Sequence, residues 1–185
     1  MGKMTLFGQP PEWEIAAGVA LLVTGGVFSV IPPTLLGKMK PKDAGIIQLV
    51  CGTITLLAGL YNFFIQKMYG PPVILPIIFG TTQISAGWHN YKEVEATGLG
   101  WLSIIYAITC VVVAWIFAST GEWIYFGLDI SWLLIYVSFI PLVSPELSQK
   151  PAVFKFLVYY NWIETYVGLL APGLIILSGH SLLMH

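Results

Sequence analysis

Long runs of apolar residues fill most of the 185-residue chain and are separated by short polar segments. A helix needs about 20 mostly apolar residues to cross the hydrocarbon core of a bilayer. The runs predict six transmembrane helices, near residues 14–36, 44–66, 71–90, 100–118, 123–143 and 156–182. Barrel strands would alternate apolar and polar residues, so we expect an all-α integral membrane protein. It would be a six-helix bundle forming one transmembrane domain over residues 1–185, with residues 1–13 as a short external tail.

The lysines are distributed unevenly between the segments that connect these helices. With the N-terminus outside, the inner segments hold Lys38, Lys40, Lys42, Lys92, Lys150 and Lys155. The outer segments hold only Lys3 and Lys67. Because positively charged loops remain on the cytoplasmic side, we expect both termini to lie outside the membrane.

Composition narrows the possible functions. Hydrophobic residues make up 57% of the chain and charged residues only 9%, whereas a soluble domain carries roughly 25% charged residues. The net charge of −1 and the lack of arginine offer no basic patch for nucleic acid. Cys51 and Cys110 lie in apolar runs, where a thiol usually acts as a small hydrophobe. With no metal-binding spacing and no phosphate-binding loop, we expect neither a cofactor nor a metal, and no enzymatic activity.

Glycines recur every seven residues in the second predicted helix, at Gly45, Gly52 and Gly59. Small residues on one face allow helix backbones to approach closely in a membrane. We therefore expect these glycines to pack against a neighbouring helix and assign them no chemistry.

Glu164 lies deep in the sixth predicted helix, where we expect it to be the one acidic residue well inside an apolar segment. An ionisable group at that depth usually faces a protein interior or a watery cavity. We expect it to border a solute pathway near Asn161, Thr165 and either Thr24 or Gln83. The alternative is a carboxyl group that joins two helices by a hydrogen bond.

Aromatic and polar residues share helix faces in three other predicted helices. Their spacing places Trp132, Tyr136 and Phe139 on one face of the fifth helix, and Phe79 and Gln83 one turn apart in the third. Leu21, Thr24 and Phe28 form a stripe on the first helix. Rings could sandwich a flat neutral solute, and a glutamine can both donate to and accept from an amide. The alternatives are rings against lipid or a neighbouring helix, and ordinary interhelical hydrogen bonds.

Four short motifs resemble the UreI/AmiS family of urea channels and short-chain amide transporters. They are GKMKPKDAGIIQLVCG (37–52), YGPPVILPIIFGTTQ (69–83), TGLGW (97–101) and WIETYVGLLAP (162–172). In the family they correspond to the first inner loop, the third helix, the start of the fourth helix and the sixth helix. The resemblance spans residues 15–180 and agrees with the predicted helix count and external termini.

The resemblance implies a hexamer with one narrow pore through each protomer. The pathway residues that it implies are Leu21, Thr24, Phe28, Phe79, Gln83, Trp132, Tyr136, Phe139 and Glu164. Gln83 stands where the family has an aromatic residue, and the fifth helix has fewer tryptophans than the family's urea channels. These changes affect the expected selectivity more than the expected fold.

Together these features predict a channel or facilitator for urea or short-chain aliphatic amides in a prokaryotic inner membrane. Its partners would be a small neutral solute, membrane lipid and further copies of itself. The alternative is a proton-coupled transporter of a small carboxylate or other small solute, with Glu164 carrying the proton.

Overall fold

In the computed structural model, which describes residues 11–148 and 150–183, the chain is helical and those residues contain no strand. The elements are α1 (Glu12–Phe28), α2 (Ile31–Leu35), α3 (Pro41–Phe64), α4 (Pro71–Lys92), α5 (Thr97–Thr120), α6 (Trp123–Phe139), a 3₁₀ turn (Ile140–Val143), α7 (Pro145–Ser148), α8 (Pro151–Glu164), a π-helical segment (Thr165–Leu170) and α9 (Ala171–Leu177). Residues 1–10 of the expected external tail lie outside the described part.

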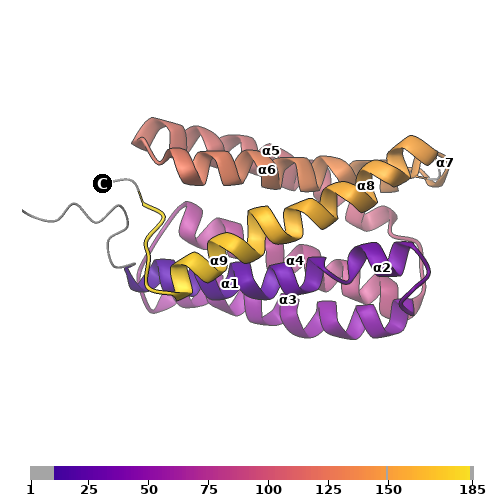
Figure 1. Ribbon diagram of the computed structural model, residues 1–185, viewed down its shortest axis with the longest axis horizontal. Coiled ribbons are helices and arrows are strands. Elements are labelled where there is room, and N and C mark those ends of the chain that lie inside the picture. Colours follow the sequence, from indigo (N-terminus) through magenta and orange to yellow (C-terminus); the bar gives the residue numbers. More distant parts are fainter. Residues whose placement is uncertain (1–10, 149, 184–185) are drawn as a thin grey trace, which may run out of the picture.

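Four helical stretches are long and apolar enough to cross a membrane: Glu12–Leu35, Pro41–Phe64, Thr97–Thr120 and Trp123–Val143. The prediction of an all-helical chain with membrane-length apolar helices is therefore confirmed. The remaining two long segments, α4 and the stretch from α8 to α9, run along the same axis (Figure 1).

Most predicted helix boundaries agree with the structure to within a few residues, and the first and sixth helices differ most. Ser29 and Val30 separate α1 from α2, which begins at the Ile31–Pro32–Pro33 sequence. A proline lacks the N–H that a helix interior requires, so the first helix is interrupted there. The sixth helix begins at Pro151 instead of residue 156, contains a π-helical segment, and ends at Leu177 instead of residue 182.

The helices form an elongated bundle in which α5 and α6 lie along one side and α1, α3 and α4 along the other (Figure 1). The segment from α8 to α9 crosses between these groups, contacting α6 through α8 and α1 through α9. The start of α1 and the end of α9 lie at the same end of the molecule, which we name the terminal end. The other end carries α2 and α7.

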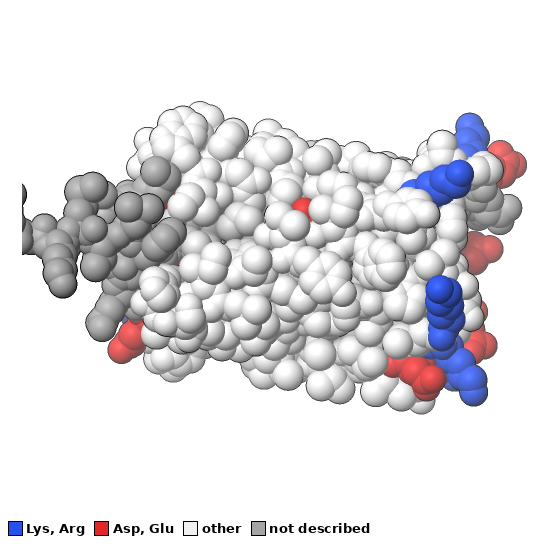
Figure 2. Space-filling model, viewed as in Figure 1, with Lys and Arg blue, Asp and Glu red and all other residues white. Residues whose placement is uncertain are grey.

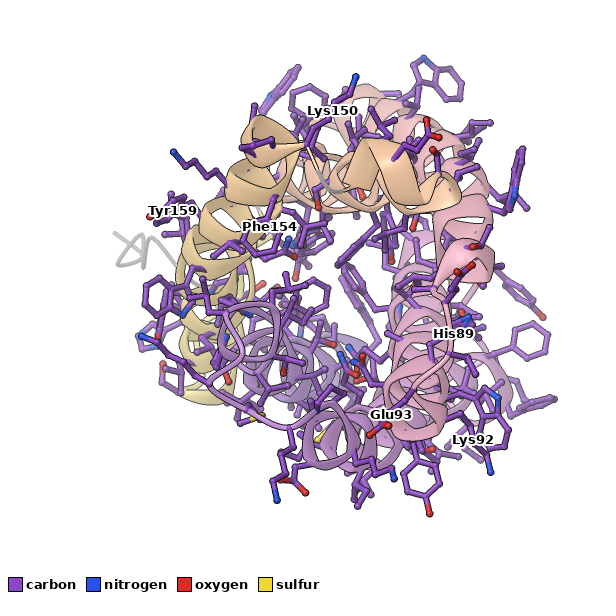
Figure 3. All side chains as sticks on the ribbon, turned by 90° about the vertical axis from the view of Figure 1, so that its right-hand side faces the viewer. His89, Lys92, Glu93, Lys150, Phe154 and Tyr159 are labelled. Carbon is purple, nitrogen blue, oxygen red and sulfur yellow. The ribbon has the colours of Figure 1, made fainter. Side chains whose placement is uncertain are left out.

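Charged side chains gather at the ends of the bundle, and the long surface between them is almost entirely uncharged (Figure 2). Lys92, Glu93 and Lys150 lie at the end opposite the termini, which we name the lysine-rich end (Figure 3). Large apolar side chains such as Val111 and Trp115 are exposed on the surface between the ends. A lipid environment accommodates such side chains, whereas water does not.

Helices α3 and α4 pack face to face along a line of glycines. A Cβ atom on Gly52 would lie 2.8 Å from the Cβ atom of Gln83, and one on Gly87 would lie 2.8 Å from the backbone nitrogen of Leu49. Real Cβ atoms essentially never come so close, so only glycine fits between these backbones. The expected packing role of the glycines in the second predicted helix is confirmed.

Candidate functional site

Three cavities follow one another through the bundle. A terminal cavity is lined from α1 residues 13–24 and α4 residues 71–79, and a central cavity from residues 27–31 and 82–86. A lysine-end cavity is lined from residues 31–35 and 86–90. Because the linings advance in step from α1 to α2 and along α4, the cavities form one axial series. Their empty volumes, which include space open to the surroundings, are about 450, 220 and 570 Å³, so the central cavity is the smallest.

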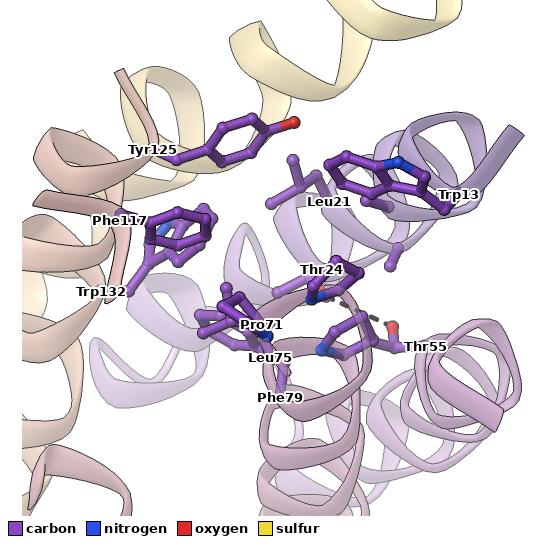
Figure 4. Close-up of a pocket in the computed structure, with 14 residues that line it drawn as sticks. Trp13, Leu21, Thr24, Thr55, Pro71, Leu75, Phe79, Phe117, Tyr125 and Trp132 are labelled. Atoms are coloured by element: carbon purple, nitrogen blue, oxygen red, sulfur yellow. Dashed lines mark hydrogen bonds between the residues drawn. The ribbon is translucent and has the colours of Figure 1, made fainter. Parts of the chain in front are cut away.

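Aromatic rings of the terminal cavity come from several helices (Figure 4). Trp13 of α1, Phe79 of α4, Phe117 of α5 and Tyr125 and Trp132 of α6 all contribute to its wall. Phe117 and Tyr125 stack with their ring centroids 5.2 Å apart. The wall is therefore mostly apolar.

Five rings form a cluster that we name the aromatic waist: Phe28, Phe79, Trp132, Tyr136 and Phe139. Phe79 and Trp132 line the terminal cavity, and Phe28 and Phe139 line the central cavity. Phe79 is its centre, with ring centroids 5.5 Å from Trp132, 5.6 Å from Tyr136 and 6.4 Å from Phe28. Phe28 also contacts Phe139 at 6.3 Å. All five side chains are buried, so the alternative that they face lipid does not hold.

The π-helical segment holds Trp132 in place. The indole N–H of Trp132 donates a 3.0 Å hydrogen bond to the backbone carbonyl of Gly168, inside this segment. A π-helical turn is wider than an α-helical turn and often occurs at functional sites. Here it supplies the acceptor that a buried indole needs.

Polar groups also border the waist. The side-chain amide of Gln83 donates to the hydroxyl of Thr24 at 2.8 Å, and Thr24 and Thr55 share a 3.3 Å hydrogen bond. Thr24 lines the terminal cavity and Gln83 the central cavity. This chain of hydrogen bonds therefore joins α1, α3 and α4 at the narrowest part of the series.

The predicted pathway residues fall into two groups. Seven line the cavities: Leu21, Thr24, Phe28, Phe79, Gln83, Trp132 and Phe139. Tyr136 belongs to the aromatic waist, whereas Glu164 lines none of the three cavities. That these residues conduct a solute stays a prediction.

Glu164 has different neighbours from those expected. Its carboxylate accepts hydrogen bonds from Ser131 at 2.8 Å and from Tyr160 at 3.4 Å. It also folds over Gly168, where a side chain would collide with it. Thr24 and Gln83 bond to each other instead.

Sequence reasoning missed two further buried carboxylates. We expected Glu164 to be the one acidic residue well inside an apolar segment, but Glu14 and Asp129 are also buried within helices. Glu14 accepts hydrogen bonds from Tyr125 and from the Ser181–Leu182 segment, at 2.6 to 2.7 Å. The apolar residues on both sides of Asp129 in the sequence could have indicated that this carboxylate is buried.

Gln48 is the third residue that the sequence did not single out. It is buried on α3, lines both the central and lysine-end cavities, and accepts a 2.7 Å hydrogen bond from Asn90. No motif marked it, because it lies one turn past the polar start of its helix. No three His, Cys, Asp or Glu residues in the described ranges come together as a metal site.

An apolar helical bundle with an axial series of cavities has the architecture of a membrane transporter. The sequence matches the family model described as AmiS/UreI family transporter over residues 16–180, and the chain belongs to this family. The resemblance noted in the sequence is thereby confirmed. No curated protein sequence matches the chain significantly.

Two solved structures have a similar fold, both of the urea channel from Helicobacter pylori. Its crystal structure has a TM-score of 0.72 and 17% identity, and the alignment covers 86% of this chain and 96% of that one. The cryo-EM structure of its closed state has a TM-score of 0.75 and 17% identity, covering 89% and 99%. At this identity the similarity establishes the fold alone.

Proposed function

We propose that the protein is a channel that passes urea or short-chain aliphatic amides across a prokaryotic inner membrane. The observation that carries this proposal is the aromatic waist in the middle of an axial series of cavities. A flat neutral solute can pack closely against ring faces, whereas the rings cannot replace the water molecules that a hydrated ion would lose. Membership of the AmiS/UreI family supports the same solute class.

In the proposed arrangement all six long helical segments span the membrane. The lysine-rich end faces the cytoplasm, because positive charge is retained on that side, and both termini face outward. The protomers assemble as a hexamer with a pathway through each. Glu164 borders this pathway indirectly. Its carboxylate lies against Gly168, and Gly168 also accepts the hydrogen bond that holds Trp132.

Coupled transport of a carboxylate is the competing function, since Glu14, Asp129 and Glu164 are buried carboxylates. The cavity linings argue against it, because none of their residues is a lysine and the chain has no arginine. A buried anion without a cationic partner is costly.

Uptake into proteoliposomes with and without a pH gradient separates the two functions. A channel for neutral solutes should equilibrate urea and acetamide at the same rate in both conditions and should not accumulate them. Accumulation of acetate above its external concentration, dependent on the gradient and on the protein, would contradict the channel.

A further inference from the structure

The side-chain oxygen of Gln83 is buried in the protein without a hydrogen-bond partner. The residue is only 1% exposed, and it lines the central cavity. Its amide nitrogen is already committed to Thr24 at 2.8 Å, and the Thr24 hydroxyl is in turn shared with Thr55. These contacts hold the side chain beside the cavity and leave its acceptor unpaired within the described residues. An unpaired buried acceptor costs free energy, which a donor on a solute would recover.

Gln48, on the facing helix α3, uses its side-chain oxygen for a hydrogen bond within the protein, whereas Gln83 uses its amide nitrogen. It is 2% exposed and lines the same cavity, and its oxygen accepts the 2.7 Å hydrogen bond from Asn90. Its amide nitrogen donates to no group within the described residues. Gln48 therefore presents a donor where Gln83 presents an acceptor.

The glycine line between α3 and α4 brings the two glutamines to one cavity. The Cβ of Gln83 lies against Gly52 of α3, and the Cβ of Gln48 lies against Gly87 of α4. Each glutamine thus extends from the close contact of the helix pair. Phe28 and Phe139 form the apolar part of the same wall.

We infer that Gln48 and Gln83 form a recognition site for primary carboxamides in the central cavity. The Gln83 oxygen accepts from the N–H of the solute, and the Gln48 amide nitrogen donates to its carbonyl oxygen. Asn90 and Thr24 are positioning residues that fix the two side chains. This inference rests on the proposed function, and it names the groups that distinguish amides from other small neutral solutes.

The pair matches the hydrogen-bonding pattern of a primary amide and of urea. Both have a carbonyl acceptor and at least two N–H donors on a planar frame. Complete N-methylation removes every donor and leaves the carbonyl, so it eliminates the bond to Gln83 alone. The two contacts can therefore be measured separately by choosing solutes.

The test measures inhibition of labelled acetamide uptake into proteoliposomes by two isomers, propanamide and N,N-dimethylformamide. They have the same atoms, but propanamide has two N–H groups and the other has none. In the wild-type protein we expect propanamide to inhibit at about tenfold lower concentration, the factor expected from one hydrogen bond. In Gln83→Met this advantage should fall to about twofold or less. In Gln48→Met both isomers should require about tenfold higher concentrations to inhibit, and the ratio between their inhibitory concentrations should stay the same.

Thr53→Val is the matched control, because Thr53 is exposed on α3 and its hydroxyl bonds only to the carbonyl of Leu49. It should behave like the wild type. If a methionine variant fails to assemble, Asn90→Leu replaces Gln48→Met and Thr24→Val replaces Gln83→Met. These variants should change the inhibition in the same way but by smaller factors. An isomer ratio that survives loss of the Gln83 oxygen overturns the inference while the channel function stands. Absence of acetamide uptake by the wild type overturns both.

Discussion

The orientation of Trp132 depends on a backbone carbonyl and on a neighbouring aromatic ring. Its indole N–H bonds to Gly168, and its ring meets Phe79 edge to face at 5.5 Å. A side chain fixed at both its polar and apolar parts can define the width of a passage. The waist is therefore sensitive to single substitutions.

Trp132→Phe removes the hydrogen bond to Gly168 and leaves a smaller ring. We expect a loss of about 1 kcal/mol in the free energy of unfolding, the usual contribution of one hydrogen bond, and faster passage of glycerol relative to urea. Trp132→Ala should lower the stability by about 3–5 kcal/mol, because it leaves a large cavity. Thermal unfolding in detergent and light scattering of proteoliposomes measure the two effects. Unchanged selectivity in both variants would show that the ring does not bound the passage.

Glu164→Gln retains a side-chain acceptor for Ser131 and Tyr160. In Glu164→Leu this acceptor is lost, and the two hydroxyls keep only backbone carbonyls, that of Leu128 for Ser131 and that of Ser131 for Tyr160. We expect the glutamine variant to assemble and conduct partially, and the leucine variant to lose far more flux. Stopped-flow urea uptake measures this difference. Equal flux through both variants and the wild type would remove Glu164 from the pathway.

The surroundings of the proposed pathway residues were only partly predictable from the sequence. Helical spacing placed Leu21, Thr24 and Phe28 on one face, and they do line consecutive cavities. Gln48 was missed because its role depends on the neighbouring helix, through Asn90 and the glycine line. For Glu164, a hydrogen bond to another helix was one of the two alternatives, and Ser131 of α6 makes it. The π-helical turn beside Glu164 was not expected, because no local residue pattern indicates it.

At the scale of helices, the close pair of α3 and α4 organises the bundle. The seven-residue spacing of glycines predicted a close contact of α3 with another helix, since it places small residues on one face, but it did not identify α4 as the partner. The break between α1 and α2 could also have been expected at Pro32 and Pro33. The order in which helices surround the cavities depends on contacts between distant segments, and periodicity does not reveal it.

Gly52→Ala tests the glycine line. The added methyl group would meet the backbone of α4, so we expect a loss of about 1–3 kcal/mol, the usual cost of overpacking. Gly26→Ala on α1 is the control, because nothing lies within 4 Å of its added methyl group. Thermal unfolding in detergent should show a lower midpoint for Gly52→Ala and no decrease for Gly26→Ala. A similar midpoint for both variants would contradict the close packing of α3 and α4.

For the whole molecule, the uncharged surface between two charged ends matches a bilayer, and in the proposed arrangement the lysine-rich end faces the cytoplasm. Much of that surface is exposed apolar side chain. Lipid can cover it, and so can further protomers.

The proposed hexamer predicts one dominant mass in mild detergent. Native mass spectrometry should give six times the 20.3 kDa of the chain. A mass of one protomer alone, under conditions in which urea flux is retained, would contradict the hexamer and leave the pathway within each protomer intact.

The most direct test of the central claim, that solute passes through the axial cavities, is stopped-flow flux through a protein whose cavities are filled. Ala86 lines both the central and lysine-end cavities, and Val111 lies exposed on the outer surface of α5. The wild type and Val111→Phe should pass urea and acetamide well above the rate of empty liposomes. Ala86→Phe, folded and assembled like the wild type, should return flux to that background. Wild-type flux through Ala86→Phe would contradict the proposed path.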